Sequence, residues 1–315
     1  MLDKFGRKIE YLRLSVTERC TLRCAYCRRD EGYCPKAAEL SAGEFTRIVK
    51  ACAQLGIKKV RLTGGEPLLR KDIIDIVHNI AQIEGISELS MTTNAQQLGG
   101  KALALKEAGL DRINISLDSL DAVKFKEMTG GDLSLVLTGI DEAIEVGLLP
   151  VKVNVVLLRG KNDSEVDDFI ALTRDKPIDV RFIELMPLGD LGEDESLRIR
   201  NDELITARPW LLPVAPRYLS QPSRDFQVDG YLGRVGFISP ISHDFCGLCN
   251  RLRLMSDGNL RMCLGVDSEI SLLPALQQGD NALLEAIREA IYHKPARHQF
   301  DADFVSDKNM SRIGG

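Results

Sequence analysis

Seven of the eight cysteines in this 315-residue chain fall into two short segments. In the first segment, Cys20, Cys24 and Cys27 follow the spacing C-x₃-C-x₂-C. Three thiolates so close together can hold a soft metal ion or an iron–sulfur cluster. A closed zinc site needs four ligands, and Cys34 would be the fourth. Cys52 stands apart on the apolar face of an expected helix, and we expect it to belong to the core.

The second segment carries Cys246, Cys249 and Cys263, spaced C-x₂-C-x₁₃-C. Taken alone, this group is compatible with a zinc site of three cysteines and His243. The stretch Arg251–Arg253 follows directly and contributes two guanidinium groups. Arginines beside a metal centre favour an anionic ligand there.

A hairpin must connect Cys249 with Cys263, and its loop length decides which side chains share a face. A two-residue turn would place Cys263 opposite Leu252, on the face away from Cys249. A three-residue loop at Ser256–Gly258, with the glycine in the left-handed conformation, places Cys263 opposite Arg251 on the same face as Cys249. We predict the three-residue loop.

Charge and composition limit the classes of function. Lys and Arg number 41 against 46 Asp and Glu, a formal net charge of −5, so a nucleic-acid partner is not expected. No apolar run is long enough for a membrane span, and the first residues lack a secretory signal. Eight cysteines in such a chain favour reduced thiols and a cytoplasmic location over disulfides. An anionic ligand must therefore be met by local cations.

The elements that position these residues alternate between strand and helix. Six short strands are expected from their Val, Ile and Leu content: residues 11–16, 59–63, 88–93, 112–117, 151–157 and 179–185. One helix begins at a capping box formed by Ser41 and Glu44 and ends at Gly56. Further helices are expected over residues 73–80, 102–108, 136–146 and 281–292, and one after residue 163.

Repeated β-α units predict an α/β fold with a parallel sheet, which an open sheet or a barrel would satisfy. Polar residues cluster where the strands end, and in a barrel these ends share one rim. We therefore expect a partial TIM-type barrel of about six β-α units in residues 1–225. Residues 226–315 form a C-terminal region with the second cysteine group. Residues 187–235 lose periodicity and are interpreted as a linker or covering segment.

The first cysteine spacing together with the turn Gly64–Pro67 resembles the radical S-adenosylmethionine (SAM) superfamily. The resemblance implies a [4Fe–4S] cluster on Cys20, Cys24 and Cys27, with one iron open to SAM. It also implies SAM contacts from four further residues: Tyr26, Gly65, Ser116 and Met186.

The second cysteine group is similar to that of the molybdenum cofactor biosynthesis protein A family, the GTP 3′,8-cyclases. The similarity rests on Cys-x₂-Cys-Asn-Arg-Leu-Arg-Leu, a later cysteine and a Gly-Gly end. It implies a second [4Fe–4S] cluster on Cys246, Cys249 and Cys263, and a 5′-deoxyadenosyl radical that attacks the ribose of GTP. The implied GTP contacts are Arg13, Arg61, Thr92, Lys152, Arg181, Arg251, Leu252 and Arg253.

The same resemblance implies a role in turnover for Arg13 and for the tail residues Gly314 and Gly315. Its implied partners are an electron donor such as flavodoxin or ferredoxin, and a downstream cyclic pyranopterin monophosphate synthase. A homodimer is also compatible with it. Two alternatives stay open: a radical SAM peptide maturase with an auxiliary cluster, and a zinc-dependent binding module.

Overall fold

The computed structural model describes residues 1–27, 39–300 and 310–314. Its strands form one sheet of twelve, in the order β12-β11-β10-β1-β2-β3-β4-β5-β6-β9-β8-β7. The central six are parallel and follow chain order, as the sequence predicts. They are β1 (Tyr11–Ser15), β2 (Lys59–Thr63), β3 (Glu88–Thr93), β4 (Arg112–Ser116), β5 (Val151–Val156) and β6 (Ile178–Ile183).

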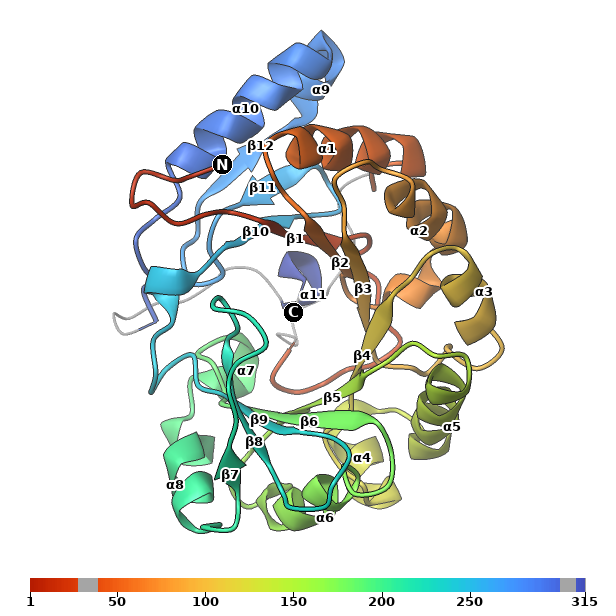
Figure 1. Cartoon of the computed structure of the whole chain (residues 1–315), viewed down its shortest axis with the longest axis vertical. Coiled ribbons are helices and arrows are strands. Elements are labelled where there is room, and N and C mark those ends of the chain that lie inside the picture. Colours follow the sequence, from red (N-terminus) through yellow and green to blue (C-terminus); the bar gives the residue numbers. More distant parts are fainter. Residues whose placement is uncertain (28–38, 301–309, 315) are drawn as a thin grey trace.

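Helices cover the outer face of these strands, and the sheet curves around a central space (Figure 1). The prediction of a partial barrel is therefore confirmed. The covering helices are α1 (Ala42–Gln54), α2 (Ile73–Ala81), α3 (Ala102–Glu107), α4 (Ala122–Thr129), α5 (Leu133–Glu145) and α6 (Val166–Ala171). Helix α1 begins at the predicted capping box, where Ser41 Oγ accepts a hydrogen bond from the Glu44 amide at 3.3 Å.

The sheet continues past the six predicted strands on both sides. Next to β1 runs β10 (Arg251–Leu254) in parallel, followed by antiparallel β11 (Asn259–Arg261) and β12 (Glu269–Ser271). Next to β6 runs β9 (Val235–Ile238) in parallel, followed by antiparallel β8 (Ser223–Gln227) and β7 (Leu212–Pro213). The C-terminal region is thus hydrogen-bonded directly to the first strand of the barrel.

The interpretation of residues 187–235 as a linker or covering segment is wrong in part. This segment contains β7, β8, α7 (Gly189–Gly192) and α8 (Asn201–Thr206). Its prolines broke the periodicity that a longer strand would show. Pro213 lies in the outermost strand, where its missing amide hydrogen costs no ladder bond.

The remaining helices are α9 (Leu273–Gln278), α10 (Asp280–Tyr292) and α11 (Met310–Ile313). Short 3₁₀ turns occur at η1 (Pro67–Leu69), η2 (Asp163–Glu165), η3 (Glu195–Leu197) and η4 (Cys246–Leu248). Helix α11 lies inside the ring of strands rather than on its outer surface (Figure 1). Within the described ranges, no helix is long and apolar enough to cross a membrane.

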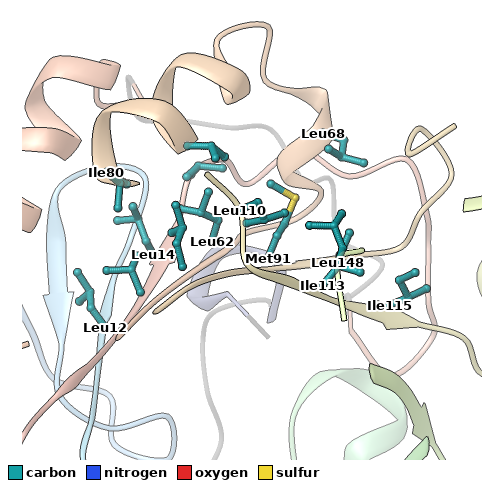
Figure 2. Packing of buried hydrophobic residues seen from close by; sticks show 14 of the residues in the cluster. Leu12, Leu14, Leu62, Leu68, Ile80, Met91, Leu110, Ile113, Ile115 and Leu148 are labelled. Atoms are coloured by element: carbon teal, nitrogen blue, oxygen red, sulfur yellow. The ribbon is translucent and has the colours of Figure 1, made fainter. Parts of the chain in front are cut away.

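Strand alternation separates the core from the barrel interior. Leu12, Leu14 and Leu62 are fully buried in the layer between strands and helices (Figure 2). Arg13 and Arg61 alternate with them and therefore point to the opposite face, into the barrel. Cys52 is buried in the same apolar layer, as expected, and burial raises the pKa of its thiol to about 12.

Candidate active site

A first pocket opens at the carboxyl ends of the central strands. Cys20, Cys24 and Cys27 line it together. The same pocket is lined by the four residues with implied SAM contacts, Tyr26, Gly65, Ser116 and Met186. Thr92, one of the implied GTP contacts, lines it as well. The structure thus brings all three cysteines and all four of those residues to one cavity.

The glycine turn after β2 packs directly against the segment that leads into Cys20. The Gly65 amide donates to the Thr17 carbonyl oxygen at 2.7 Å. A Cβ atom on Gly65 would lie 2.5 Å from the Glu18 carbonyl oxygen and still closer to that of Arg19. Only glycine permits this approach, because any side chain would displace the backbone before the first cysteine.

Glu66, the next residue, joins the ends of two strands, β2 and β3. Its buried carboxylate accepts hydrogen bonds from the Thr93 hydroxyl at 2.6 Å, the Asn94 amide at 2.7 Å and the Leu68 amide at 3.0 Å. Burial raises the pKa of Glu66, although these donors partly offset that effect. The Asn94 side chain then contacts Cys20 Sγ at 3.6 Å. Glu66 therefore orients a polar group that reaches the first cysteine.

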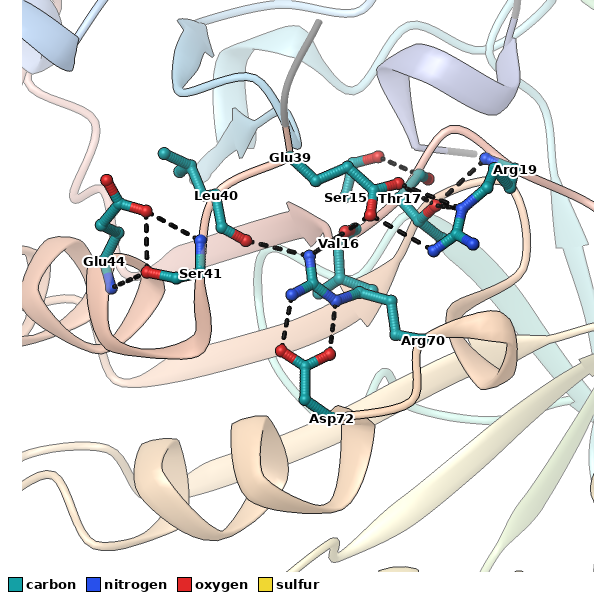
Figure 3. Close-up of polar contacts among 10 residues, drawn as sticks. All are labelled: Ser15, Val16, Thr17, Arg19, Glu39, Leu40, Ser41, Glu44, Arg70 and Asp72. Carbon is teal, nitrogen blue, oxygen red and sulfur yellow. Dashed lines mark hydrogen bonds and ion pairs between the residues drawn. The ribbon is translucent and has the colours of Figure 1, made fainter.

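Arg70 closes the base of the loop that carries the first three cysteines (Figure 3). Its Nη1 donates to the carbonyl oxygens of Val16 and Leu40, at 3.0 Å each. Its other nitrogens form a bidentate pair with Asp72 at 2.7 and 2.8 Å. One buried guanidinium thus fixes both the start and the return of the loop. Sequence analysis assigned no role to Arg70.

A buried carboxylate holds Tyr26 in place. The Tyr26 hydroxyl donates to Asp118 Oδ2 at 2.6 Å, and the Val156 amide donates to Asp118 Oδ1 at 2.9 Å. Burial raises the pKa of Asp118 to about 6, and these two donors oppose the rise. Asp118 lies two residues after Ser116, just past the end of β4, and the sequence analysis assigned no role to it.

A second pocket contains the other cysteine group. Cys246, Cys249 and Cys263 line it with five arginines of the implied GTP set: Arg13, Arg61, Arg181, Arg251 and Arg253. Three implied contacts lie elsewhere, and Thr92 in the first pocket is one of them. Leu252 is fully buried in the apolar core, and Lys152 pairs with Asp179 at 3.8 Å on the neighbouring strand.

The hairpin behind the second pocket has the predicted three-residue loop. Arg253 pairs with Arg261, and Leu254 with Leu260, which leaves residues 256–258 as the loop. Gly258 has φ +84°, the left-handed conformation that the loop requires. The same register, continued by two residues, sets Cys263 opposite Arg251. Strand β10 also places Arg253 beside Arg13 of β1.

The second pocket is strongly electropositive. Arg61, Arg181 and Arg253 are buried, and burial lowers the pKa of Arg181 and Arg253 to about 10. Burial also lowers the pKa of Lys152 to about 6, helped by the nearby Arg181. Among the described side chains, Arg181 Nε and Arg251 Nη2 are buried and have no hydrogen-bond partner. Unpaired buried donors in a cationic pocket indicate a site for an anion.

The arginines also act on the cysteines. Burial alone would raise the pKa of the Cys249 thiol, but Arg251 and Lys294 outweigh it and hold that pKa below its ordinary value. Lys294 is itself buried and donates to the Met262 carbonyl oxygen, next to Cys263. This environment favours a thiolate, the form that binds iron.

The sulfur spacing favours clusters over single zinc ions. A tetrahedral zinc ion with bonds of about 2.3 Å needs ligand atoms within about 4 Å of one another. In the part of the chain that the structure describes, the group within 4.8 Å is Asp244, Cys246 and His298, and neither cysteine trio is that compact. His243, the ligand that the zinc alternative requires, instead pairs with Asp202 at 3.3 Å. Three cysteines per pocket fit an iron–sulfur cluster with one position open. Cys34 lies outside the described residues.

The C-terminal tail reaches both pockets. Met310 lines each of them, and Arg253 Nη1 donates a hydrogen bond to the Gly314 carbonyl oxygen. A Cβ atom on Gly314 would lie 2.8 Å from Thr63 Cγ2, so the chain is threaded closely against β2. Gly315 lies outside the described residues. The two pockets adjoin, because four residues line both: Asn154, Ile183, Met186 and Met310.

Known proteins resemble the chain along its whole length. The radical SAM superfamily matches residues 14–173, and Molybdenum Cofactor Synthesis C matches residues 178–300. A GTP 3′,8-cyclase of Alkaliphilus oremlandii is 49% identical over 321 residues, covering 100% of both chains. One of Listeria monocytogenes serovar 1/2a is 44% identical over 329 residues, covering 99% of this chain and 98% of that one.

A solved structure shares the fold. Streptococcus suis SuiB bound to S-adenosylmethionine has a TM-score of 0.58 and 16% identity. The match covers 92% of this chain and 65% of that one, so this chain spans about two thirds of its length.

Proposed function

The chain belongs to the radical SAM family of GTP 3′,8-cyclases, and on this premise we propose that its two pockets bind SAM and GTP side by side. The reaction converts GTP to 3′,8-cyclo-7,8-dihydro-GTP, the first step of molybdenum cofactor biosynthesis. One observation carries the proposal: the cysteine pocket at the strand ends adjoins the arginine-rich pocket, and the two share four lining residues. A radical formed in the first pocket can therefore reach the substrate ribose without leaving the barrel.

Cys20, Cys24 and Cys27 would hold the first [4Fe–4S] cluster, which with SAM supplies a 5′-deoxyadenosyl radical that removes the hydrogen at C3′ of the ribose. The chain's own groups shape the SAM side of the pocket. Asp118 fixes Tyr26, and Gly65, which has no side chain, lets the turn after β2 pack directly against the segment before Cys20. Ser116 and Met186 complete the lining.

Cys246, Cys249 and Cys263 would hold the second [4Fe–4S] cluster, beside the guanine base. The triphosphate is bound by converging arginines in a low-dielectric cavity, where each charge–charge contact is stronger than in water. They are Arg13, Arg61, Arg181, Arg251 and Arg253. This resolves the apparent conflict between an acidic protein and an anionic substrate, because the local charge rather than the total decides.

The tail assists by filling space between the pockets. Met310 contributes a side chain to each cavity, and Gly314 provides a carbonyl acceptor for Arg253. We propose that this tail orients Arg253 and excludes water from the reacting ribose. Gly315 is proposed to share this role.

The wider assignments are proposals of the same kind. We propose a cytoplasmic enzyme that receives electrons from flavodoxin or ferredoxin and passes its product to cyclic pyranopterin monophosphate synthase. We also propose that the enzyme forms a homodimer. The boundary between the barrel (residues 1–225) and the C-terminal region (residues 226–315) is proposed too, although β8 (Ser223–Gln227) crosses it and one sheet joins both parts. The alternative of a peptide maturase has support in fold only, because SuiB, which has been solved bound to its precursor peptide SuiA, is 17% identical to this chain.

The test incubates anaerobically reconstituted, reduced enzyme with SAM and either GTP, ATP or no nucleotide. Deoxyadenosine and a cyclised nucleotide should form with GTP alone. Iron analysis should give about eight irons per chain, as two four-iron clusters require. Cys249→Ala should lose about four of them, whereas Cys52→Ala, a matched change in the core, should lose none. If deoxyadenosine forms at the same rate with and without GTP, GTP is not the substrate.

A further inference from the structure

Arg312 in α11 contacts carboxylates from three separate segments of the chain. Its Nη2 lies 2.8 Å from Asp257 Oδ2, and its Nε lies 3.2 Å from Glu18 Oε1. Glu269 Oε2 completes the set at 3.8 Å from Nη2. The three carboxylate side chains are 8–12% exposed, so these are largely shielded ion pairs.

Two of these carboxylates belong to the loops that carry the cysteines. Glu18 lies two residues before Cys20, and Asp257 lies in the hairpin loop before Cys263. Asp257 is oriented within its own loop, since the Asn259 amide and side chain donate to it at 3.1 and 2.9 Å. Arg312 therefore ties the first cysteine loop to the hairpin of the second.

The same contacts place the end of the chain. The Gly314 amide donates to the Met310 carbonyl oxygen at 2.9 Å, and the Met310 amide donates to the Cys27 carbonyl oxygen at 3.2 Å. The Gly314 carbonyl oxygen then meets Arg253. A single turn of helix cannot hold this position by itself, so its anchor must come from side-chain contacts such as those of Arg312.

An exposed ion pair contributes little, about 0–1 kcal/mol. Arg312 differs from that case because it is surrounded by three carboxylates and is 29% exposed. Burial alone would lower its pKa, but Asp257, Glu269 and Glu18 together raise it. Glu269 is shared with Arg261 at 3.3 Å, whereas Asp257 forms the shortest of the three contacts with Arg312, at 2.8 Å.

We propose that Arg312 is a positioning residue that keeps the tail docked between the two cysteine loops and so couples SAM cleavage to cyclisation of GTP. The coupling part of this inference rests on the proposed function, whereas the docking of the tail does not. Arg312 lines neither pocket among the described residues, and acts through Gly314 on Arg253.

Docking is tested first, by hydrogen exchange with mass spectrometry on the reconstituted full chain. In Arg312→Ala, the amides of residues 311–314 should exchange at least tenfold faster, with β1 and β10 unchanged. In Arg312→Lys, the exchange rate of the same amides should lie between that of Arg312→Ala and that of the unmodified enzyme, because lysine keeps the charge but lacks the planar guanidinium that contacts several carboxylates. Asp257→Asn should resemble Arg312→Ala, and the double variant should add little to either. Arg288→Ala, which removes an exposed arginine paired with Glu285 at 3.0 Å, is the control.

Coupling is tested next, as the ratio of cyclised nucleotide to deoxyadenosine. We expect the ratio to fall at least fivefold in Arg312→Ala, with the KM for SAM within twofold of the unmodified enzyme. Unchanged exchange in the tail overturns the docking inference. A proportional loss of both products, at an unchanged ratio, shows a merely structural role and overturns the coupling. If the unmodified enzyme forms no cyclised nucleotide, the proposed function is wrong. The hydrogen-exchange measurement still tests the docking of the tail in that case. If Arg312→Ala does not fold, Arg312→Lys and Asp257→Asn decide.

Discussion

Arg13 and Arg253 are register partners on adjacent parallel strands, β1 and β10, although 239 residues separate them in the sequence. Burial and then the neighbouring Arg253 hold the pKa of Arg13 well below its ordinary value. Two like charges placed side by side store an unfavourable interaction that an anion relieves. The hydrogen bonds between β1 and β10 therefore join the second cysteine region to the barrel. Because they also place Arg13 beside Arg253, they create a site for an anion.

Replacing Arg253 should separate substrate binding from stability. In Arg253→Met we expect GTP to bind at least tenfold more weakly, about 1.4 kcal/mol or more, because the triphosphate loses a buried cation. The unliganded protein should melt no lower than the unmodified one, since one of two adjacent charges is gone. Calorimetric titration with GTP and with SAM, together with thermal melts, measures both effects. Equal losses of GTP and SAM affinity would mean that Arg253 is structural.

Lys152 should make GTP binding depend on pH. Burial lowers the pKa of Lys152 to about 6, so the free enzyme carries a neutral amine at pH 7.5. Lys152 does not line the second pocket, but it lies near Arg181, which does, so a triphosphate bound there should raise the pKa of Lys152 and binding then takes up a proton. Affinity should consequently fall as pH rises above 6, by at most about tenfold per unit.

Titration of GTP at pH 7.5 in two buffers of different ionisation enthalpy measures the uptake. We expect roughly one proton fewer in Lys152→Met than in the unmodified enzyme. If the unmodified enzyme takes up no more protons than this variant, the assignment of Lys152 is wrong.

Gly65 should tolerate no side chain. In Gly65→Ala the new Cβ would overlap the carbonyl oxygens of Glu18 and Arg19, so the loop before Cys20 must shift. We expect about four irons per chain to be lost on reconstitution, with the second cluster retained. Gly43→Ala is the matched control, because nothing lies within 4 Å of its Cβ position and α1 should gain about 1 kcal/mol. Full iron content in Gly65→Ala would contradict the close approach.

Asp118 and Tyr26 should act as one unit in SAM binding. Asp118→Asn and Tyr26→Phe each disturb the hydrogen bond of 2.6 Å between them. Each should weaken SAM binding by about three- to tenfold, the size expected for one ordinary hydrogen bond. The double variant should be little worse than either single one. Additive losses, measured by titration with SAM, would show that the two residues act separately.

The sequence predicted the six central strands and the hairpin loop because both depend on local patterns. Strand ends follow from runs of Val, Ile and Leu, and Gly258 marks the loop by its conformational freedom. The four strands β7, β8, β9 and β12, which lie toward the two ends of the sheet, were missed, since they are short and their pairing is decided by contacts far along the chain.

The site was predicted less evenly. Both cysteine groups were found from their spacing, and Arg13 and Arg61 from the family resemblance. Arg70 and Arg312 were not found, because their partners lie tens or hundreds of residues away and leave no periodic trace. An arginine three residues after the Gly64–Pro67 turn was the available signal for Arg70.

The central claim is that the first pocket delivers its radical to the ribose bound in the second. GTP carrying deuterium at C3′, incubated with SAM and the reduced enzyme, tests it directly. We predict that mass spectrometry will find one deuterium in the deoxyadenosine for each molecule of cyclised nucleotide. Deoxyadenosine without deuterium, formed alongside the cyclised nucleotide, would contradict transfer between the two pockets.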